Sequence, residues 1–172
     1  MKNLKWIALV FCALFFFLSS SCGYRFEGGG YLKDTVTQVA VLVLKNQSAE
    51  TGAAITFTDA LIQEIISKTD TKVVDEKSAS AVLKGTIKSI TFATLSRSTT
   101  ESVVERRITA AVDLQLINKE GEVIWSVTNF FADDEYDLSE NQLTDESNRK
   151  EAVEKIAKRM AEKLVSKLLT NF

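Results

Sequence analysis

The order of apolar and polar positions divides the chain into alternating strand and helix signals. An uninterrupted apolar run, Val39–Leu44, is typical of a strand that is buried on both faces. Residues 51–67 then bring apolar side chains to helical spacing, which predicts an amphipathic helix. The side chains expected on its buried face are Ala54, Ile55, Thr58, Leu61, Ile62 and Ile65. A short strand is predicted next, over Thr71–Val74.

From Ala81 onward the apolar positions recur with the period of two that is typical of β-strands. They share one parity up to Ile87, whereas Ile90 and Phe92 have the other parity. One extra residue in the strand would produce this change. The pattern therefore predicts a β-bulge near Lys88–Ser89.

Two further strands follow, joined by a tight turn. Apolar and polar residues alternate from Ile108 to Leu116, as expected when one face of a strand lies in the core. Asn118–Gly121 is typical of a hairpin turn, because a glycine at its end can adopt the positive φ that closes it. Val123, Trp125 and Val127 then share one face of the returning strand.

Residues 133–146 contain seven acidic residues and no basic one, so we expect a solvated loop that leads to a helix. The stretch has no glycine, which argues against a calcium-binding loop. Ser147 is expected to cap the final helix. An apolar stripe from Val153 to Leu168 makes that helix amphipathic.

These elements predict an α+β domain in which a mixed β-sheet carries two amphipathic helices packed on one face. The first strand is expected to be central, and the helix after it permits parallel pairing with the next strand. The later hairpins must be antiparallel. The strands at residues 82–95 and 104–117 would each span about 45 Å when extended, so we expect their hairpin to reach beyond the helices.

The amino terminus has the features of an export signal. Lys2 and Lys5 precede thirteen apolar residues, Trp6–Leu18. This apolar core is too short for a permanent membrane-spanning helix, so residues 1–21 are interpreted as a signal peptide that is removed.

The residues before Cys22 resemble a bacterial lipobox, although Leu18 lies one position further out than is usual. Cys22 is therefore the predicted lipidation site. Cleavage by an ordinary signal peptidase, which would leave a free thiol, is the alternative. Lipoproteins that stay at the inner membrane commonly have an aspartate directly after the acylated cysteine. This chain has Gly23 at that position, which favours the outer membrane. Residues 22–35 are assigned to an acylated amino terminus and flexible tether, and residues 36–172 to a single domain.

Composition argues against several classes of function. Removing Lys2 and Lys5 leaves 19 basic and 23 acidic residues, a net charge of −4, which does not suit nucleic-acid binding. The chain has no histidine, the commonest metal ligand and general base. Ser147–Lys150 matches the Ser-x-x-Lys spacing of penicillin-binding enzymes, but its companion motifs are absent. We therefore expect no enzyme activity, no metal and no cofactor.

Three arginines flank the tip of the long predicted hairpin: Arg97 on one strand, and Arg106 and Arg107 on the other. Arginine binds phosphate through paired hydrogen bonds, which makes these residues a candidate ligand site. The alternative is cross-strand pairing with Glu101 and Glu105.

The chain resembles the LPS-assembly lipoprotein E (LptE) family of Gram-negative outer membranes. The segments that carry the resemblance are Cys22–Phe26, Gly28–Leu32, Val39–Val41 with Asn46, Ala79–Ile87, Gly121–Trp125, Tyr136 and the terminal helix ending in Phe172. Their order and spacing make the match, which covers essentially the whole mature chain. Two departures stand out: Lys33 follows Leu32 where the family often has proline, and Lys45 precedes Asn46 where an aromatic residue is common.

This resemblance implies a two-helix, mixed-sheet domain that lies inside an LptD-type β-barrel and helps insert lipopolysaccharide into the outer leaflet. The implied partners are that barrel, lipopolysaccharide and the outer membrane, which the protein would contact from the periplasmic side through its lipid anchor. Lipopolysaccharide is phosphorylated, which gives Arg97, Arg106 and Arg107 a candidate ligand. Curli-secretion subunits and peptidoglycan-synthase activators are the alternatives, because their domains begin with a similar strand.

Overall fold

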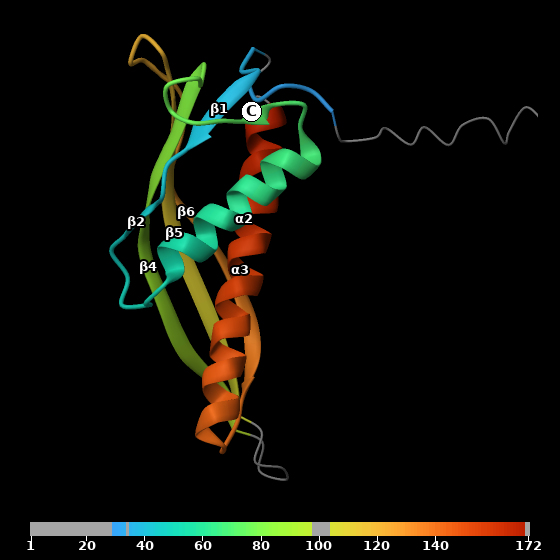
Figure 1. The fold of residues 1–172 in the computed structure, drawn as a ribbon. Helices are drawn as coiled ribbons and strands as arrows, with labels where there is room; N and C mark the ends of the chain where they lie inside the picture. Colours follow the sequence, from blue (N-terminus) through green and yellow to red (C-terminus); the bar gives the residue numbers. More distant parts are fainter. Residues whose placement is uncertain (1–28, 34, 98–103, 171–172) are drawn as a thin grey trace, which may run out of the picture.

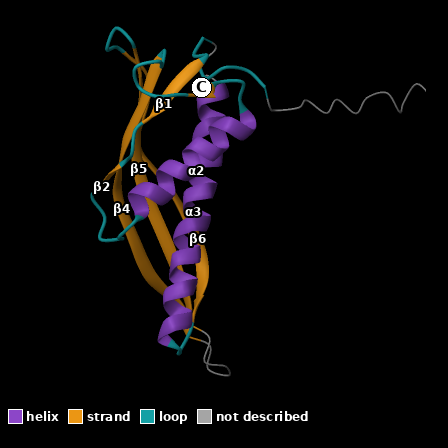
Figure 2. Cartoon of the chain, viewed as in Figure 1, coloured by secondary structure: helices purple, strands orange, loops and turns teal. Residues whose placement is uncertain are grey.

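The computed structural model describes residues 29–33, 35–97 and 104–170. The elements, in chain order, are β1 (Gln38–Val41), β2 (Lys45–Asn46), α2 (Ala53–Lys68), β3 (Lys72–Val73), β4 (Ala81–Arg97), β5 (Val104–Asn118), β6 (Val123–Leu138) and α3 (Gln142–Thr170). The strands form one sheet of order β3-β1-β4-β5-β6, with β2 also paired to β4. Both helices lie on the same face of this sheet (Figure 1; Figure 2). The predicted α+β fold with a mixed sheet and two helices on one face is confirmed.

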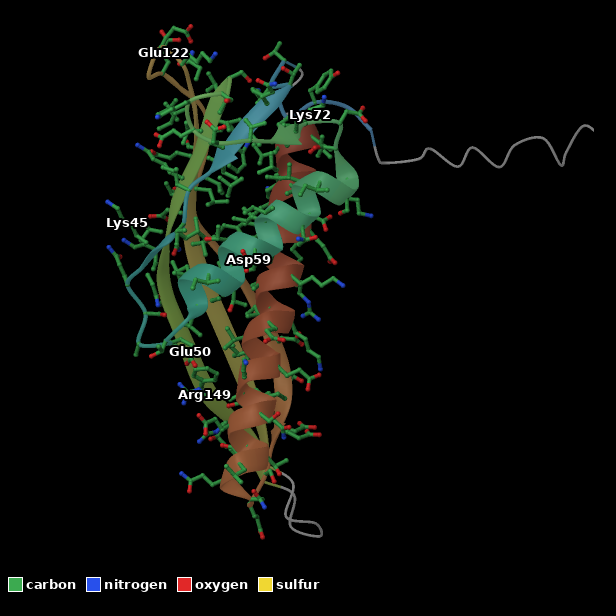
Figure 3. All side chains as sticks on the ribbon, viewed as in Figure 1. Lys45, Glu50, Asp59, Lys72, Glu122 and Arg149 are labelled. Carbon is green, nitrogen blue, oxygen red and sulfur yellow. The ribbon has the colours of Figure 1, made fainter. Side chains whose placement is uncertain are left out.

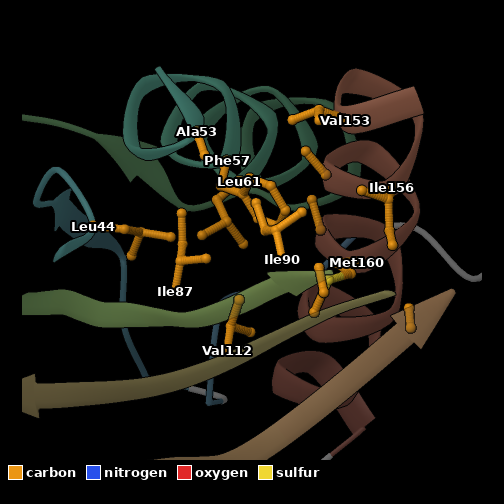
Figure 4. Close-up of a cluster of buried hydrophobic side chains, with 14 of the residues drawn as sticks. Leu44, Ala53, Phe57, Leu61, Ile87, Ile90, Val112, Val153, Ile156 and Met160 are labelled. Atoms are coloured by element: carbon orange, nitrogen blue, oxygen red, sulfur yellow. The ribbon is translucent and has the colours of Figure 1, made fainter. Parts of the chain in front are cut away.

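β1 occupies the interior position that its apolar sequence predicts, because it lies between β3 and β4 and is parallel to both. It is shorter than expected and ends at Val41. The backbone then leaves the ladder, and the Leu44 N–H donates to the Thr58 hydroxyl of α2 at 3.0 Å. This contact draws Leu44 into the core beside the helix (Figure 4), and the chain rejoins β4 only as β2.

The buried face of α2 differs in part from the predicted one. Thr58, Leu61 and Ile65 are buried as expected. Ile55, however, is 62 % exposed, so its predicted burial is wrong. The helix is rotated so that Phe57 enters the main core cluster instead, which removes a larger apolar surface from water.

β4 and β5 keep the predicted alternation on either side of the bulge, but β6 does not: a register shift places Val123 opposite Ile117 and leaves it 52 % exposed, so its predicted place on one face with Trp125 and Val127 is wrong. The register of β4 against β5 shifts between Ile87 and Ser89, which confirms the predicted bulge, and shifts again between Thr94 and Ser96. The β5 side chains buried under the helices are Ile108, Ala110, Val112, Leu114 and Leu116. Gly121, with φ 84°, closes the turn to β6 as predicted.

The acidic stretch is not the loop that its charge suggests, because β6 continues as a strand to Leu138. It remains paired with β5 over this region, with Asp133 opposite Thr109 and Glu135 opposite Arg107. β5 supplies the backbone hydrogen bonds, and most of these acidic side chains stay exposed to water. The strand therefore tolerates a charge that would prevent folding at a buried position.

The final helix also begins earlier than predicted. α3 starts at Gln142, and its cap is Asn141, whose side-chain oxygen accepts hydrogen bonds from the N–H groups of Leu143 (3.0 Å) and Thr144 (3.3 Å). Ser147 lies inside the helix, so its assignment as the cap is wrong. With 29 residues, α3 is about 43 Å long. It therefore runs beside the long strands to the end of their described residues (Figure 1), and the predicted tip of the hairpin lies outside the residues that the structure describes.

The bulge after Ile87 separates two parts of the sheet. In the proximal half, β1, β2 and β3 extend the sheet beyond β4. In the distal half, only β4 from Ser89, β5 up to Ala111 and β6 from Phe131 lie side by side. The predicted apolar stripe of α3 is buried across both halves, and Figure 4 shows Ile156 and Met160 of this stripe in the main cluster.

Residues just before β1 are fastened to the domain. The Asp70 carboxylate accepts a hydrogen bond from the Gly30 N–H at 2.8 Å, and the Thr71 hydroxyl accepts one from the Leu32 N–H at 2.9 Å. The Leu32 side chain is fully buried. These contacts hold Gly29–Lys33 against the domain. Residues 29–33 are part of the segment 22–35 that is predicted to be a flexible tether. None of the helices described has the length and apolarity required to cross a membrane.

Candidate functional site

The residues predicted to carry function lie partly outside the described structure. Cys22 is not among the described residues. Arg97 is the last residue of β4 and pairs with Val104 in the register, but its side chain is not described. Arg106 and Arg107 both lie on β5.

Arg106 and Arg107 point to opposite faces of the sheet, because successive side chains of a strand alternate. Arg106 is half-buried and shares the helix-covered face with Ile108. Arg107 lies on the opposite face, where its guanidinium donates to the Glu135 carboxylate at 3.0 Å. The cross-strand partner is thus a residue of β6 and not Glu105. The structure does not bring the two arginines together on one face.

Arg149 has no local sequence signal that marks it as important, yet it contacts two segments that are distant in the chain; Figure 3 labels it together with Glu50. Its guanidinium donates to the Glu50 carboxylate at 2.6 Å and lies over the Phe92 ring, 4.5 Å from the ring centre. The Glu50 side chain is only 17 % exposed, so this ion pair is less screened by water than a surface pair. No sequence signal links Arg149 to Glu50, because 99 residues separate them.

Aromatic packing continues from this contact across the distal half. Phe92 of β4 meets Tyr136 of β6 edge to face, with ring centres 6.1 Å apart. The Tyr136 hydroxyl is buried and has no hydrogen-bond partner among the described residues. An unpaired buried hydroxyl is costly, so packing here is less favourable than in the purely apolar core.

Side chains of α3 cover the outer edge of β6. Arg159 donates to the backbone carbonyl of Asp133 at 2.8 Å and pairs with the Asp134 carboxylate at 3.3 Å. Asn148 donates to the backbone carbonyl of Asp137 at 2.9 Å. These contacts satisfy carbonyl groups that an edge strand otherwise presents to solvent.

We call the face of the sheet opposite the helices its open face. It is mainly polar, although Phe131 on it is 65 % exposed. Its polar residues on β5 and β6 include Glu105, Arg107, Thr109, Asp113, Gln115, Ser126, Asp133 and Glu135. This surface suits an aqueous environment better than lipid.

A hollow of about 270 Å³ lies between β6 and α3, lined in part by Glu135, Asn148, Glu151 and Lys155. Two of its carboxylates are already paired, Glu135 with Arg107 and Glu151 with Lys155. Across the parts of the chain that are described, His, Cys, Asp and Glu side chains form no group of three or more that could hold a metal ion.

One carboxylate, that of Asp75 in the loop between β3 and β4, has a clearly shifted pKa. The Ser78 hydroxyl donates to it at 3.0 Å, and the backbone N–H groups of Ser78 and Lys77 donate as well. These hydrogen bonds favour the charged form and lower the pKa of Asp75 below its ordinary value of 3.8. The effect is structural, because the bonds fix the loop before β4.

A model of the family described as "LptE: Lipopolysaccharide-assembly" matches residues 36–168, which is most of the chain. The comparison with curated proteins finds no match.

Solved structures with a similar fold come from several bacteria. A protein described as a homologue of a neuraminyllactose-binding hemagglutinin, from Helicobacter pylori, has a TM-score of 0.55 at 11 % identity and covers 86 % of this chain and 90 % of its own. A Caulobacter crescentus protein described as a lipoprotein has a TM-score of 0.53 at 15 % identity, covering 74 % and 88 %. Lipoprotein B from Nitrosomonas europaea has a TM-score of 0.50 at 15 % identity, covering 85 % and 90 %. At these identities the likeness concerns the fold alone.

Proposed function

Because the chain belongs to the LptE lipopolysaccharide-assembly family, we propose that it is an outer-membrane lipoprotein that pairs with an LptD-type β-barrel. Together the two proteins would insert lipopolysaccharide into the outer leaflet of the outer membrane. The single observation that carries this proposal is the family match over residues 36–168, which spans the entire sheet, α2 and all of α3 except its last two residues.

We propose that Cys22 is the acylated first residue of the mature protein, after removal of residues 1–21. A lipoprotein cysteine of this kind carries three acyl chains, enough for stable attachment to a membrane. Hydrogen bonds from Gly29 and Gly30 to the end of α2 and to Asp70 hold the chain against the domain from Gly29 onward. Only the residues between Cys22 and Gly29 would therefore separate the domain from the membrane surface, on the periplasmic side.

The polar open face supports a position inside a barrel. Wide outer-membrane barrels have a polar interior that contains water. A domain whose open face carries Thr109, Asp113 and Gln115 can lie in such a lumen because water there can still hydrogen-bond to these polar side chains. Phe131 and Val123 are exposed apolar side chains on this face that a barrel wall would cover.

Arg97, Arg106 and Arg107 remain the proposed lipopolysaccharide contacts. Arg106 has no hydrogen-bond or ion-pair partner among the described residues. Arg107 would have to exchange Glu135 for a phosphate group. We therefore propose that Arg106 contributes more to phosphate binding than Arg107.

The proposed role is not catalytic. Ser147 and Lys150 are exposed on α3, and neither has a hydrogen-bond partner among the described residues. A nucleophilic serine needs an adjacent base to activate it. The assembly role instead requires a stable surface and a lipid anchor.

The proposal is tested by isolating the full-length protein from its native outer membrane in mild detergent and analysing its partners and its amino terminus by mass spectrometry. We expect a triacylated Cys22 and a large barrel protein at one-to-one stoichiometry. An unmodified cysteine without a barrel would contradict the proposal. An acylated protein in a homo-oligomeric ring would favour a secretion role.

The arginine contacts are tested in the same preparation by measuring the lipopolysaccharide that co-purifies. Arg106→Gln should reduce it several-fold, and Arg107→Gln should reduce it less. Lys158→Gln is the matched control, because Lys158 is an exposed cation on α3 that has no ion-pair partner among the described residues. If all three variants retain equal amounts, these arginines do not bind the lipid.

A further inference from the structure

The distal half of the sheet has two outer edges, and the structure protects only one of them. Along β6, carbonyl groups of the outer edge accept hydrogen bonds from Arg159 and Asn148 of α3. Acidic side chains also follow one another along this edge. Both features are means by which natural proteins prevent another strand from pairing with an edge.

The other edge belongs to β4. β1 pairs with β4 as far as Leu83, and β2 pairs with it as far as Ile87. Beyond Ile87, no described strand lies beside this side of β4, which forms the border of the sheet in Figure 1. We call the seven residues Ser89–Leu95 the β4 distal edge.

The direction of the backbone groups on this edge follows from the hydrogen bonds above it. The carbonyls of Leu83 and Ile87 face outward, because they accept from the N–H groups of Leu42 and Gln47 at 2.9 Å. Outward-facing residues alternate along a strand, and the bulge at Lys88 moves them to the other parity. Ile90, Phe92 and Thr94 therefore present their N–H and C=O groups outward. None of these groups has a hydrogen-bond partner in the described parts of the chain.

The side chains of the β4 distal edge would allow another strand to pair with it. Its sequence, Ser-Ile-Thr-Phe-Ala-Thr-Leu, contains no charge, no proline and no glycine, and β-branched and aromatic residues favour extended structure. Thr91, Ala93 and Thr94 are exposed, and their small side chains allow a second backbone to approach. The edge therefore lacks every device that protects β6.

We propose that the β4 distal edge is a docking site at which an extended segment of the barrel partner adds as a further strand of the sheet. Backbone hydrogen bonds to Ile90, Phe92 and Thr94 would supply the affinity, as in other cases of strand addition. This inference rests on the function proposed above, and it specifies where the partner binds.

Charge indicates the chemistry of the added segment. Lys88, at the end of the edge, is exposed and has no ion-pair partner among the described residues. The segment should carry a carboxylate near Lys88 and uncharged residues opposite Thr91 and Ala93. Antiparallel pairing of two copies of this chain about Phe92 would provide Lys88 with no carboxylate, so a different chain fits better.

The experiment compares amide hydrogen exchange in the full-length protein isolated with the barrel and in the same protein produced without it. Exchange of the Ile90, Phe92 and Thr94 amides should slow by at least about tenfold in the complex, because a paired amide exchanges only when the pairing opens. The Thr91 and Ala93 amides face β5 and should change much less.

A pair of variants at one position provides the second measurement. Thr94→Pro removes an outward N–H while leaving the hydrogen bonds between β4 and β5 in place. It should lower recovery of the barrel several-fold relative to Thr94→Val, which keeps that N–H. Circular dichroism spectra of the two variants should match, which would show that the proline has not unfolded the domain.

The outcomes separate this inference from the proposed function. A barrel that co-purifies while Ile90, Phe92 and Thr94 exchange as in the free protein overturns the strand addition and leaves the proposed function in place. Protection of the same amides in a homodimer without a barrel overturns the choice of occupant and the proposed function together. Slower exchange of the Ile90, Phe92 and Thr94 amides in the complex, with Thr91 and Ala93 little changed, supports strand addition when Thr94→Pro also loses the barrel.

Discussion

The proximal and distal halves of the sheet are built from the same three long strands but are stabilised in different ways. In the proximal half, β4 lies between β1 and β5, and fully buried side chains such as Leu83, Leu114 and Leu116 fill the space under the helices. In the distal half, the Phe92 and Tyr136 rings are only half-buried, and the side chains of Arg149 and Arg159 hold α3 in place.

This difference shows two ways of holding helices against one face of the same sheet. Apolar burial in the proximal half is worth about 25 cal/mol per Å² and depends on many contacts at once. In the distal half, polar contacts made by the long side chains of Arg149 and Arg159 add to the burial of Ile90, Ile108, Ala110 and Ala132. Changes in the proximal half should therefore cost more stability, and changes in the distal half should alter local order first.

The largest effect is expected at Gly85 in the proximal half. A Cβ at this position would collide with the Leu114 side chain and with the backbone carbonyl of Asp113. The carbonyl belongs to the sheet and cannot move aside, so Gly85→Ala should destabilise the domain by about 3 kcal/mol, at the upper end for overpacking. Chemical denaturation monitored by circular dichroism measures this loss.

Gly121→Asn is the control for Gly85→Ala. Gly121 has a positive φ and open space around it, and asparagine tolerates that backbone conformation. Its cost should stay below about 1 kcal/mol. Equal losses in the two variants would mean that the collision at Gly85 is relieved by movement of the strands.

Phe92→Ala should produce the next largest effect, in the distal half. It removes the ring that contacts both Tyr136 and Arg149. Because Phe92 is only half-buried, we expect a loss of about 2 kcal/mol, below the usual range for a buried phenylalanine. Phe92→Leu keeps most of the apolar volume, so its smaller loss measures the ring contacts themselves. A loss as large as that of Gly85→Ala would contradict the contrast between the halves.

A smaller effect is expected when Arg149 is replaced by lysine. Lysine keeps the charge but cannot stack a planar group on Phe92 while donating to Glu50. The expected cost is about 1 kcal/mol, near the upper limit for a partly exposed ion pair. A double-mutant cycle that combines Arg149→Gln with Glu50→Gln isolates the pairwise energy, and additive losses in that cycle would show that the ion pair contributes nothing beyond packing.

The smallest effect is expected at Asp75, where a polar contact supports the proximal half. The lowered pKa means that the folded state prefers the charged carboxylate. Its stabilising contribution is present above pH 3.8 and is lost as the pH falls through the lower pKa of the folded state. Asp75→Asn should therefore be slightly less stable than the natural protein at neutral pH, and the difference should disappear in acid. Thermal unfolding at several pH values tests this, and a difference that persists below that lower pKa would contradict it.

Local pattern predicted most of the proximal half correctly. The interior β1 strand, the bulge after Ile87, the alternation along β5 and the turn at Gly121 all follow from the period and chemistry of neighbouring residues. They could be predicted because burial and turn geometry act over a few residues at a time. The apolar stripe of α3 belongs to the same class.

The errors concern places where a distant segment overrides the local signal. Ile55 and Phe57 both fit an apolar helix face, and only packing against the sheet selects Phe57. The acidic residues after Ala132 suggest a loop, yet pairing with β5 extends them as a strand. The candidate phosphate site was predicted from proximity along the hairpin, and the alternation of β5 separates Arg106 from Arg107.

The sequence by itself therefore determined the α+β fold, its mixed sheet and the family resemblance, because these depend on the periodicity and order of segments. Only the tertiary structure decided which segments Arg149 joins, which edge of the sheet α3 covers and which edge of β4 stays open. Those features depend on contacts between residues that are far apart in the chain. Long side chains such as arginine can reach many partners, and the pattern of neighbouring residues does not specify which one they meet.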